Sequence, residues 1–105
     1  MFISIHVNQY NDENVKGPMV YFEDGLDDSY LLACDIQEEL NMLTSNNKQV
    51  HEGDFYLFKK CNPPGVLIEC GFISNDEERY ELLNEDYQIS LAQAIYNGIY
   101  NFYLR

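Results

Sequence analysis

Basic residues are scarce in this sequence, and several features that mark other classes of protein are missing. Only six lysines and arginines stand against eighteen aspartates and glutamates, for a formal net charge of −12. No stripe of basic residues offsets these acidic residues, which argues strongly against a nucleic-acid partner. No apolar stretch approaches the roughly 18–20 residues that a membrane span requires. No basic segment followed by an apolar one marks a signal peptide, and the sequence assigns no cellular compartment.

Cysteine is also sparse. Cys34, Cys61 and Cys70 are odd in number and lack C-x-x-C spacing, so they indicate neither a zinc finger nor a disulfide framework. Reduced, unreactive thiols are expected instead. Apolar material is plentiful, since hydrophobic residues make up 46% of the chain, with nine tyrosines and six phenylalanines. A chain of 105 residues with this composition predicts one folded domain with a core of modest size.

The order of the apolar patterns predicts an α/β domain with one small mixed sheet. Four short runs rich in strand formers should supply its strands: residues 2–7, 19–22, 55–58 and 66–70. About three helices should flank it: residues 29–43, a short one over 74–83 and a long final one that Asn84 caps. Asp27, Asp28 or Ser29 should cap the first helix, and residues 44–53 should form a polar loop.

Two of these predicted strands end in chemically capable side chains. The apolar run 66–68 leads directly to Glu69, and the run 2–7 carries His6 near its end. A carboxylate beside a buried strand is costly to desolvate unless it is paired, bound to a metal or used in chemistry. We expect His6 and Glu69 to converge at one edge of the sheet, close enough to flank a metal ion and a water molecule. The simpler alternative is a strand-end glutamate that backbone groups or solvent satisfy.

Six consecutive segments carry a resemblance to a known family. They are Ser4-Ile5-His6-Val7-Asn8, Gly17 to Phe22, Leu32 to Leu40, Asp54 to Phe58, Val66 to Asn75 and Tyr87 to Ile99. In order and in spacing, the sequence resembles the C-terminal part of the zinc-dependent N-acetylmuramoyl-L-alanine amidases. These bacterial cell-wall hydrolases include the sporulation amidases, and they act on the wall outside the cytoplasm. The resemblance covers nearly every residue of the chain.

The resemblance implies roles for four residues. In the family, the His of S-I-H-x-N is a zinc ligand and the Glu of V-E-x-G-F is the catalytic acid/base; His6 and Glu69 hold these positions here. It also implies substrate contacts for Asn8 and for Lys48, which stands where relatives often carry arginine. The implied reaction is hydrolysis of the amide between the lactyl group of muramic acid and L-alanine. Zn²⁺ activates water and the carboxylate moves the proton.

The sequence departs from the family in its zinc ligands. A Gly-His-Gly turn with the first His ligand and a helix-borne Glu ligand lie upstream of S-I-H-x-N in the family, and only His6 is matched here. A catalytic zinc generally uses three protein ligands and a water. We therefore expect residues 1–105 to form a partial catalytic domain that holds zinc weakly and is inactive alone. The other histidine, His51, falls in the predicted loop, at a position without a ligand role.

Two classes of function remain open. One is an amidase without the family's N-terminal strand and helices, and the other is a non-catalytic remnant that binds cell-wall peptide or a protein partner. In either case an apolar patch and a sheet edge should be exposed, so we expect self-association or a need for a complementary N-terminal segment. A cysteine hydrolase built on Cys70 and His6 is disfavoured. Cys70 follows Glu69 in a strand, so its side chain should face the other side of the sheet.

Overall fold

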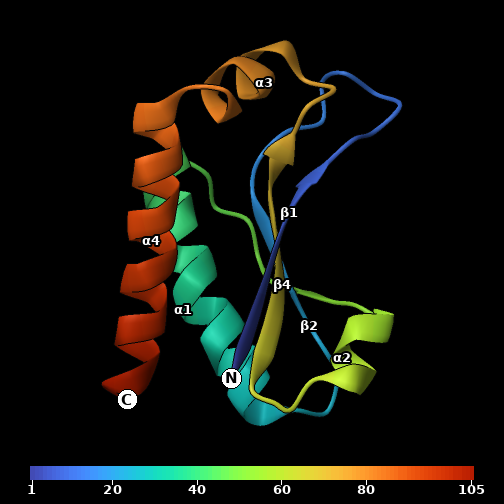
Figure 1. Ribbon diagram of the computed structural model, residues 1–105, viewed down its shortest axis with the longest axis vertical. Coiled ribbons are helices and arrows are strands. Elements are labelled where there is room, and N and C mark those ends of the chain that lie inside the picture. Colours follow the sequence, from blue (N-terminus) through green and yellow to red (C-terminus); the bar gives the residue numbers. More distant parts are fainter.

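One mixed sheet with helices on both faces makes up the whole chain, as the computed structural model shows for residues 1–105 (Figure 1). This confirms the predicted α/β class. In chain order the elements are β1 (Phe2–Asn8), β2 (Met19–Phe22), α1 (Asp27–Thr44), β3 (His51–Glu52), α2 (Tyr56–Lys60), β4 (Gly65–Phe72), α3 (Asp76–Leu82) and α4 (Glu85–Tyr103). No helix combines the length and the hydropathy needed to span a bilayer.

The four strands lie in the order β1-β4-β2-β3. Strand β4 is central; it runs parallel to β1 and antiparallel to β2, and β2 runs parallel to the two-residue β3. Five of the eight residues of β4 are hydrophobic, two more are glycines, and seven of the eight are buried. A nearly continuous apolar run of this kind is typical of a strand that is covered on both faces.

Helices α1 and α4 cover one face of the sheet, and the short α2 covers part of the other (Figure 1). Val20, Val66 and Ile68 point toward α1 and α4 and are fully buried in one core cluster with Leu32, Ile36 and Leu40 of α1. The three α1 residues are spaced at four, which places them on one helical stripe, as the sequence predicted. On the second face, Phe58 of α2 packs against the Phe2 ring at a centroid distance of 6.0 Å.

The start of α1 differs from the prediction. Leu26 is the residue before the helix, and no side chain caps it. Asp27 and Asp28 already lie in the first turn, where their charge still favours the helix dipole. Ser29 is buried and its hydroxyl accepts a hydrogen bond from the Gly65 N–H at 3.0 Å. Its side chain therefore fixes the helix to the start of β4 and does not serve as a cap.

The predicted strand over residues 55–58 is wrong, because this segment leads into helix α2. Phe58 is buried and Phe55 half-buried, while Tyr56 between them is 73% exposed. Spacing of three residues puts Phe55 and Phe58 on one side of a helical turn, and their rings meet edge-on at 5.5 Å. A four-residue apolar run fits a strand or a helix equally well, so its periodicity could not distinguish the two structures. The fourth strand is β3, inside the predicted loop.

The last two helices begin where the capping patterns predicted. The Asn75 side chain accepts from Glu78 N–H at the start of α3, and the Asn84 side chain accepts from Tyr87 N–H at the start of α4. The Glu78 side chain does not complete a capping box by accepting from the Asn75 N–H. Its carboxylate accepts from Phe72 N–H at 2.8 Å and from Gly17 N–H at 2.7 Å. It thereby ties the end of β4 to the segment that leads into β2.

Candidate active site

His6 and Glu69 lie directly beside each other in the sheet. They are partners in the parallel register of β1 and β4, and Glu69 is also paired with Met19 of β2. Strands in a sheet are about 4.8 Å apart, and paired residues project to the same face. Ile68 and Cys70 flank Glu69 in β4 and belong to the core cluster with α1 and α4, so Glu69 and His6 lie on the opposite face of the sheet. The two side chains therefore share one open region of the sheet surface.

The Glu69 carboxylate has an unusual environment. Burial raises its pKa above the ordinary value, and the neighbouring His6 acts in the opposite direction. One of its oxygens, Oε2, is the one buried side-chain oxygen or nitrogen in the chain that has no hydrogen-bond partner. Buried polar atoms nearly always have a partner, so an orphaned carboxylate oxygen points to a donor or a cation from outside the chain. A strand-end glutamate satisfied by backbone does not describe this residue.

Two residues that the sequence reasoning missed border this pair. The Ser4 hydroxyl lies 2.6 Å from Nε2 of His6, one strand repeat before it on the same face. Tyr21 of β2 is paired with Leu67, two residues before Glu69. Burial raises the Tyr21 pKa, and the Glu69 charge raises it further. The period of two in a strand could have found Ser4, because residues at i and i+2 share a face. Tyr21 lies in another strand, and its place depends on the pairing of β2 with β4.

The structure does not bring both proposed substrate-contact residues to this face. Asn8 ends β1, two residues after His6, and its side chain accepts from the Gln9 N–H at 2.7 Å. The Lys48 ammonium instead donates to the Lys16 carbonyl and lies 6.0 Å from the centre of the Phe72 ring. The structure therefore gives Lys48 a role in holding its loop, and substrate contact by Lys48 stays a prediction from the resemblance.

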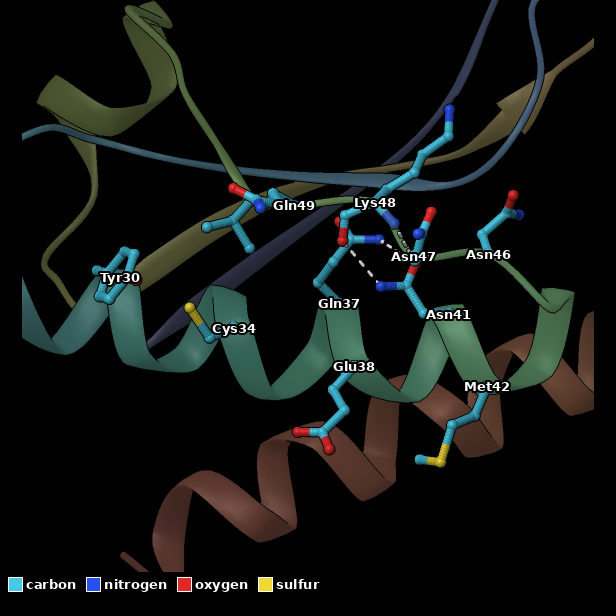
Figure 2. A pocket seen from close by; sticks show the side chains of 11 residues that line it. Tyr30, Cys34, Gln37, Glu38, Asn41, Met42, Asn46, Asn47, Lys48 and Gln49 are labelled. Atoms are coloured by element: carbon cyan, nitrogen blue, oxygen red, sulfur yellow. Dashed lines mark hydrogen bonds between the residues drawn. The ribbon is translucent and has the colours of Figure 1, made fainter.

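A groove of about 590 Å³ runs along α1, away from His6 and Glu69, neither of which lines it. Figure 2 shows that its polar side chains hold the loop after α1 in place, and that Lys48 points away from the helix. Gln37 accepts from Val20 N–H at 2.9 Å and donates to Asn41, whose own amide donates to the Lys48 carbonyl at 2.8 Å. These groups satisfy one another, so the groove is a packing feature of the loop.

The chain does not contain a complete metal site. No group of three or more His, Cys, Asp and Glu side chains comes together in a way that could hold a metal ion. His51 is exposed, as expected, although it lies in β3 and not in a loop; its ring stands 5.7 Å from that of Tyr21. His6 would fit one ligand position of a zinc centre, with the orphaned Glu69 oxygen beside it. A catalytic zinc generally needs three protein ligands, and residues 1–105 bring no two further ligands close to His6.

Cys70 is unsuited to nucleophilic catalysis. Its side chain belongs to the buried core cluster beneath α1 and α4, on the face opposite Glu69. Burial, with a further contribution from the Glu69 charge, raises the Cys70 pKa to about 11. At neutral pH only about one thiol in ten thousand would be ionised, and the thiolate is the reactive form. The structure therefore agrees with the sequence in disfavouring a cysteine hydrolase.

Comparison with known proteins gives one consistent answer. The family described as N-acetylmuramoyl-L-alanine amidase matches residues 1–101. The chain belongs to this amidase family. A germination-specific N-acetylmuramoyl-L-alanine amidase of Bacillus subtilis is 32% identical over 98% of this chain and 44% of its own length. The uncharacterized protein YqiI of the same organism is 39% identical over 98% of this chain and 51% of its own length.

Solved structures of amidases share the fold of this family member. The CwlD amidase of Clostridioides difficile, solved in complex with the GerS lipoprotein, is 42% identical with a TM-score of 0.94. The match covers 98% of this chain and 54% of the CwlD chain. Zinc dependence is a general property of the family. The chain thus spans about half the length of each of these three relatives.

Proposed function

We propose that this chain supplies one part of the active site of a peptidoglycan amidase. In this proposal Glu69 is the general acid/base and His6 is one ligand to zinc. The observation that supports it best is the pairing of these two residues on an open sheet face, with a buried Glu69 oxygen left without a partner. The matched relatives are about twice as long, so the other zinc ligands would come from polypeptide outside residues 1–105.

The substrate would be the amide between the lactyl group of muramic acid and L-alanine of the stem peptide. When bound at such a site, zinc polarises the scissile carbonyl and lowers the pKa of water. Glu69 accepts the proton of the attacking water and returns it to the leaving amine of L-alanine. Its position one strand from His6 places the carboxylate beside the metal ligand without using it as one. Ser4 holds the His6 ring through its contact with Nε2.

The absence of a three-ligand group favours a second candidate, a non-catalytic remnant that binds cell-wall peptide or a protein partner. A cleavage assay separates the two. The chain is joined to the part of the C. difficile CwlD amidase that it does not match, and muropeptides are tested for release of a new L-alanine amino terminus. We expect cleavage by the chimera and none by residues 1–105 alone. A folded chimera that loads zinc but leaves the amide intact would favour the remnant.

A further inference from the structure

Strand β4 carries a bulge directly after Glu69. In the register of β1 and β4, His6 is paired with Glu69. The next pair is Asn8 with Phe72, so one residue of β1 lies opposite two residues of β4. Such β-bulges are common next to active sites, where they change the direction of a side chain. The direction of Glu69 on the open face therefore depends on how the chain is held at this bulge.

Beyond the bulge, β4 is hydrogen-bonded on both sides. On one side, the Ile73 N–H donates to the carbonyl at the end of β1 at 2.9 Å. Backbone groups alternate along a strand, so the N–H of Phe72, the residue before, points to the other side. Strand β2 does not reach this point, because it begins at Met19, which is paired with Glu69. The Phe72 N–H donates instead to Oε1 of Glu78 at 2.8 Å.

The same carboxylate binds a second backbone donor. The N–H of Gly17, in the segment that leads into β2, donates to Oε2 of Glu78 at 2.7 Å. The N–H groups of Gly17 and Phe72 come from different segments, and neither can accept a hydrogen bond from the other. A carboxylate offers two acceptor oxygens, one for each donor, and bonds to a charged acceptor are stronger than neutral ones. Glu78 thus takes the place of a missing rung between β4 and the start of β2.

Glu78 is itself held at both ends. It lies in the first turn of α3, and its N–H donates to the Asn75 side chain that caps this helix. Its carboxylate lies against the backbone of the bulge: a Cβ atom at Gly71 would stand 3.1 Å from Oε1 of Glu78 and 3.3 Å from Cδ1 of Leu82. A group that positions another must have little freedom of its own, and Glu78 meets this condition.

The segment that follows β4 also holds the loop between β1 and β2. The Tyr10 N–H donates to the Ser74 hydroxyl at 3.0 Å, and the Asn75 amide donates to the Glu13 carbonyl at 2.9 Å. Together with the Gly17 bond, these contacts fix three points along the loop. In Figure 1 this segment and α3 lie at the carboxyl end of β4. The bridge is therefore one part of a connected set of bonds around the bulge.

We propose that Glu78 is a positioning residue that sets the direction of Glu69. The inference rests on the proposed function, in which Glu69 is the general acid/base. Phe72, at one end of the bulge, is bonded to Glu78, and Glu69 lies at the other end. Without a second acceptor, one of the two bridged N–H groups loses its partner and the bulge loosens. The Glu69 carboxylate then keeps its place in the strand but loses its fixed direction beside His6.

The first test is NMR of the full chain and of Glu78→Gln. Glutamine keeps the length of the side chain but has only one acceptor oxygen, and its NH₂ group is a donor that faces a donor. We expect hydrogen exchange of the Phe72 or the Gly17 amide to become about tenfold faster or more. Nuclear Overhauser contacts between the Glu69 methylene protons and the His6 ring should weaken at the same time.

Two further variants make this result specific. Glu77→Gln removes the same charge from the neighbouring residue of α3, whose carboxylate pairs with Lys16 at 3.2 Å on the surface. It should change neither the amide exchange nor the side-chain contact. Gly71→Ala keeps both acceptor oxygens and presses on them from the bulge, so it should weaken the same side-chain contact. This variant carries the test if Glu78→Gln does not fold.

The second test is a double-mutant cycle in the chimera with the CwlD segment. Glu78→Gln should lower kcat for muropeptides about 10- to 100-fold and leave KM and zinc content unchanged, because Glu78 binds neither substrate nor metal in this proposal. In the Glu69→Gln background the same change should lower kcat less than about twofold, since no carboxylate is left to direct. A purely structural role would lower kcat by the same factor in both backgrounds.

Two outcomes would overturn the proposal. One is a folded Glu78→Gln chain in which both amides and the contact of Glu69 with His6 are as in the unchanged protein. The other is an equal loss of kcat with and without Glu69. Failure of the proposed function looks different, because the unchanged chimera would then hold zinc and cleave no muropeptide. The weakened contact of Glu69 in the NMR measurement would still support positioning by Glu78.

Discussion

Glu69→Gln in the chimera with the CwlD segment is expected to lower turnover of muropeptides by about 10²–10⁴-fold, the usual contribution of a general acid/base. Glutamine keeps the size and position of the side chain beside His6, but it cannot accept the proton of the attacking water. Zinc content should stay at the level of the unchanged chimera, because Glu69 is not a ligand in this account. The measurement is the rate of L-alanine amino-terminus release, with zinc determined on the same samples.

A folding defect would not explain such a loss. Burial raises the pKa of Glu69 in the folded chain, so its ionised form costs stability at pH values above that pKa. This cost disappears as the pH falls below the pKa of the unfolded chain. Glu69→Gln should therefore melt no lower than the unchanged protein at neutral pH, and the difference should shrink in acid. His51→Ala serves as the control for turnover, and an equal loss in that variant would contradict the assignment.

Gly98→Val is expected to destabilise the fold by about 3 kcal/mol, at the upper end of the usual range for overpacking. A Cβ atom at Gly98 would stand 2.5 Å from Cα and 2.9 Å from the backbone N of Ile36. Backbone atoms cannot turn aside as a side chain can, so α1 and α4 must separate. A domain of this size has only about 5–15 kcal/mol of stability in total, so the loss is a large share.

Urea denaturation of the two forms measures this effect. Gln93→Ala is the control, since Gln93 is exposed in the middle of the same helix and its substitution should change stability by less than about 0.5 kcal/mol. Stability equal to that of the unchanged protein in Gly98→Val would mean that the close approach of α1 to α4 is not what holds the helices on the sheet.

Long periodic segments were predictable from the sequence, and short ones were not. Strands β1 and β4 and helices α1 and α4 carry enough apolar residues in one period for pattern and length to agree. The run at 55–58 is too short for this, and its helix forms because Phe55 and Phe58 pack on one side of a turn. Strand β3 has no pattern of its own. Its two residues adopt an extended backbone because they pair with Tyr21 and Phe22 of β2.

The candidate site was likewise predictable only in part from the sequence. His6 and Glu69 could be selected from the sequence because a polar side chain that directly follows or interrupts an apolar run needs a reason. Their register could not be predicted, and neither could the orphaned Oε2, since both depend on how β1 and β4 align. The Lys48 ammonium was assigned by resemblance alone. Its bond to the Lys16 carbonyl follows from loop packing that no local pattern records.

The most direct test of the central claim is the zinc content of the protein after dialysis, measured by atomic emission. Residues 1–105 offer one imidazole and one carboxylate, so we expect far less than one zinc per chain. The chimera with the CwlD segment should hold one zinc, and His6→Ala in that chimera should lose it, because a catalytic zinc rarely survives the loss of one of three ligands. One tightly bound zinc on the isolated chain, or a chimera that keeps its zinc without His6, would contradict the account.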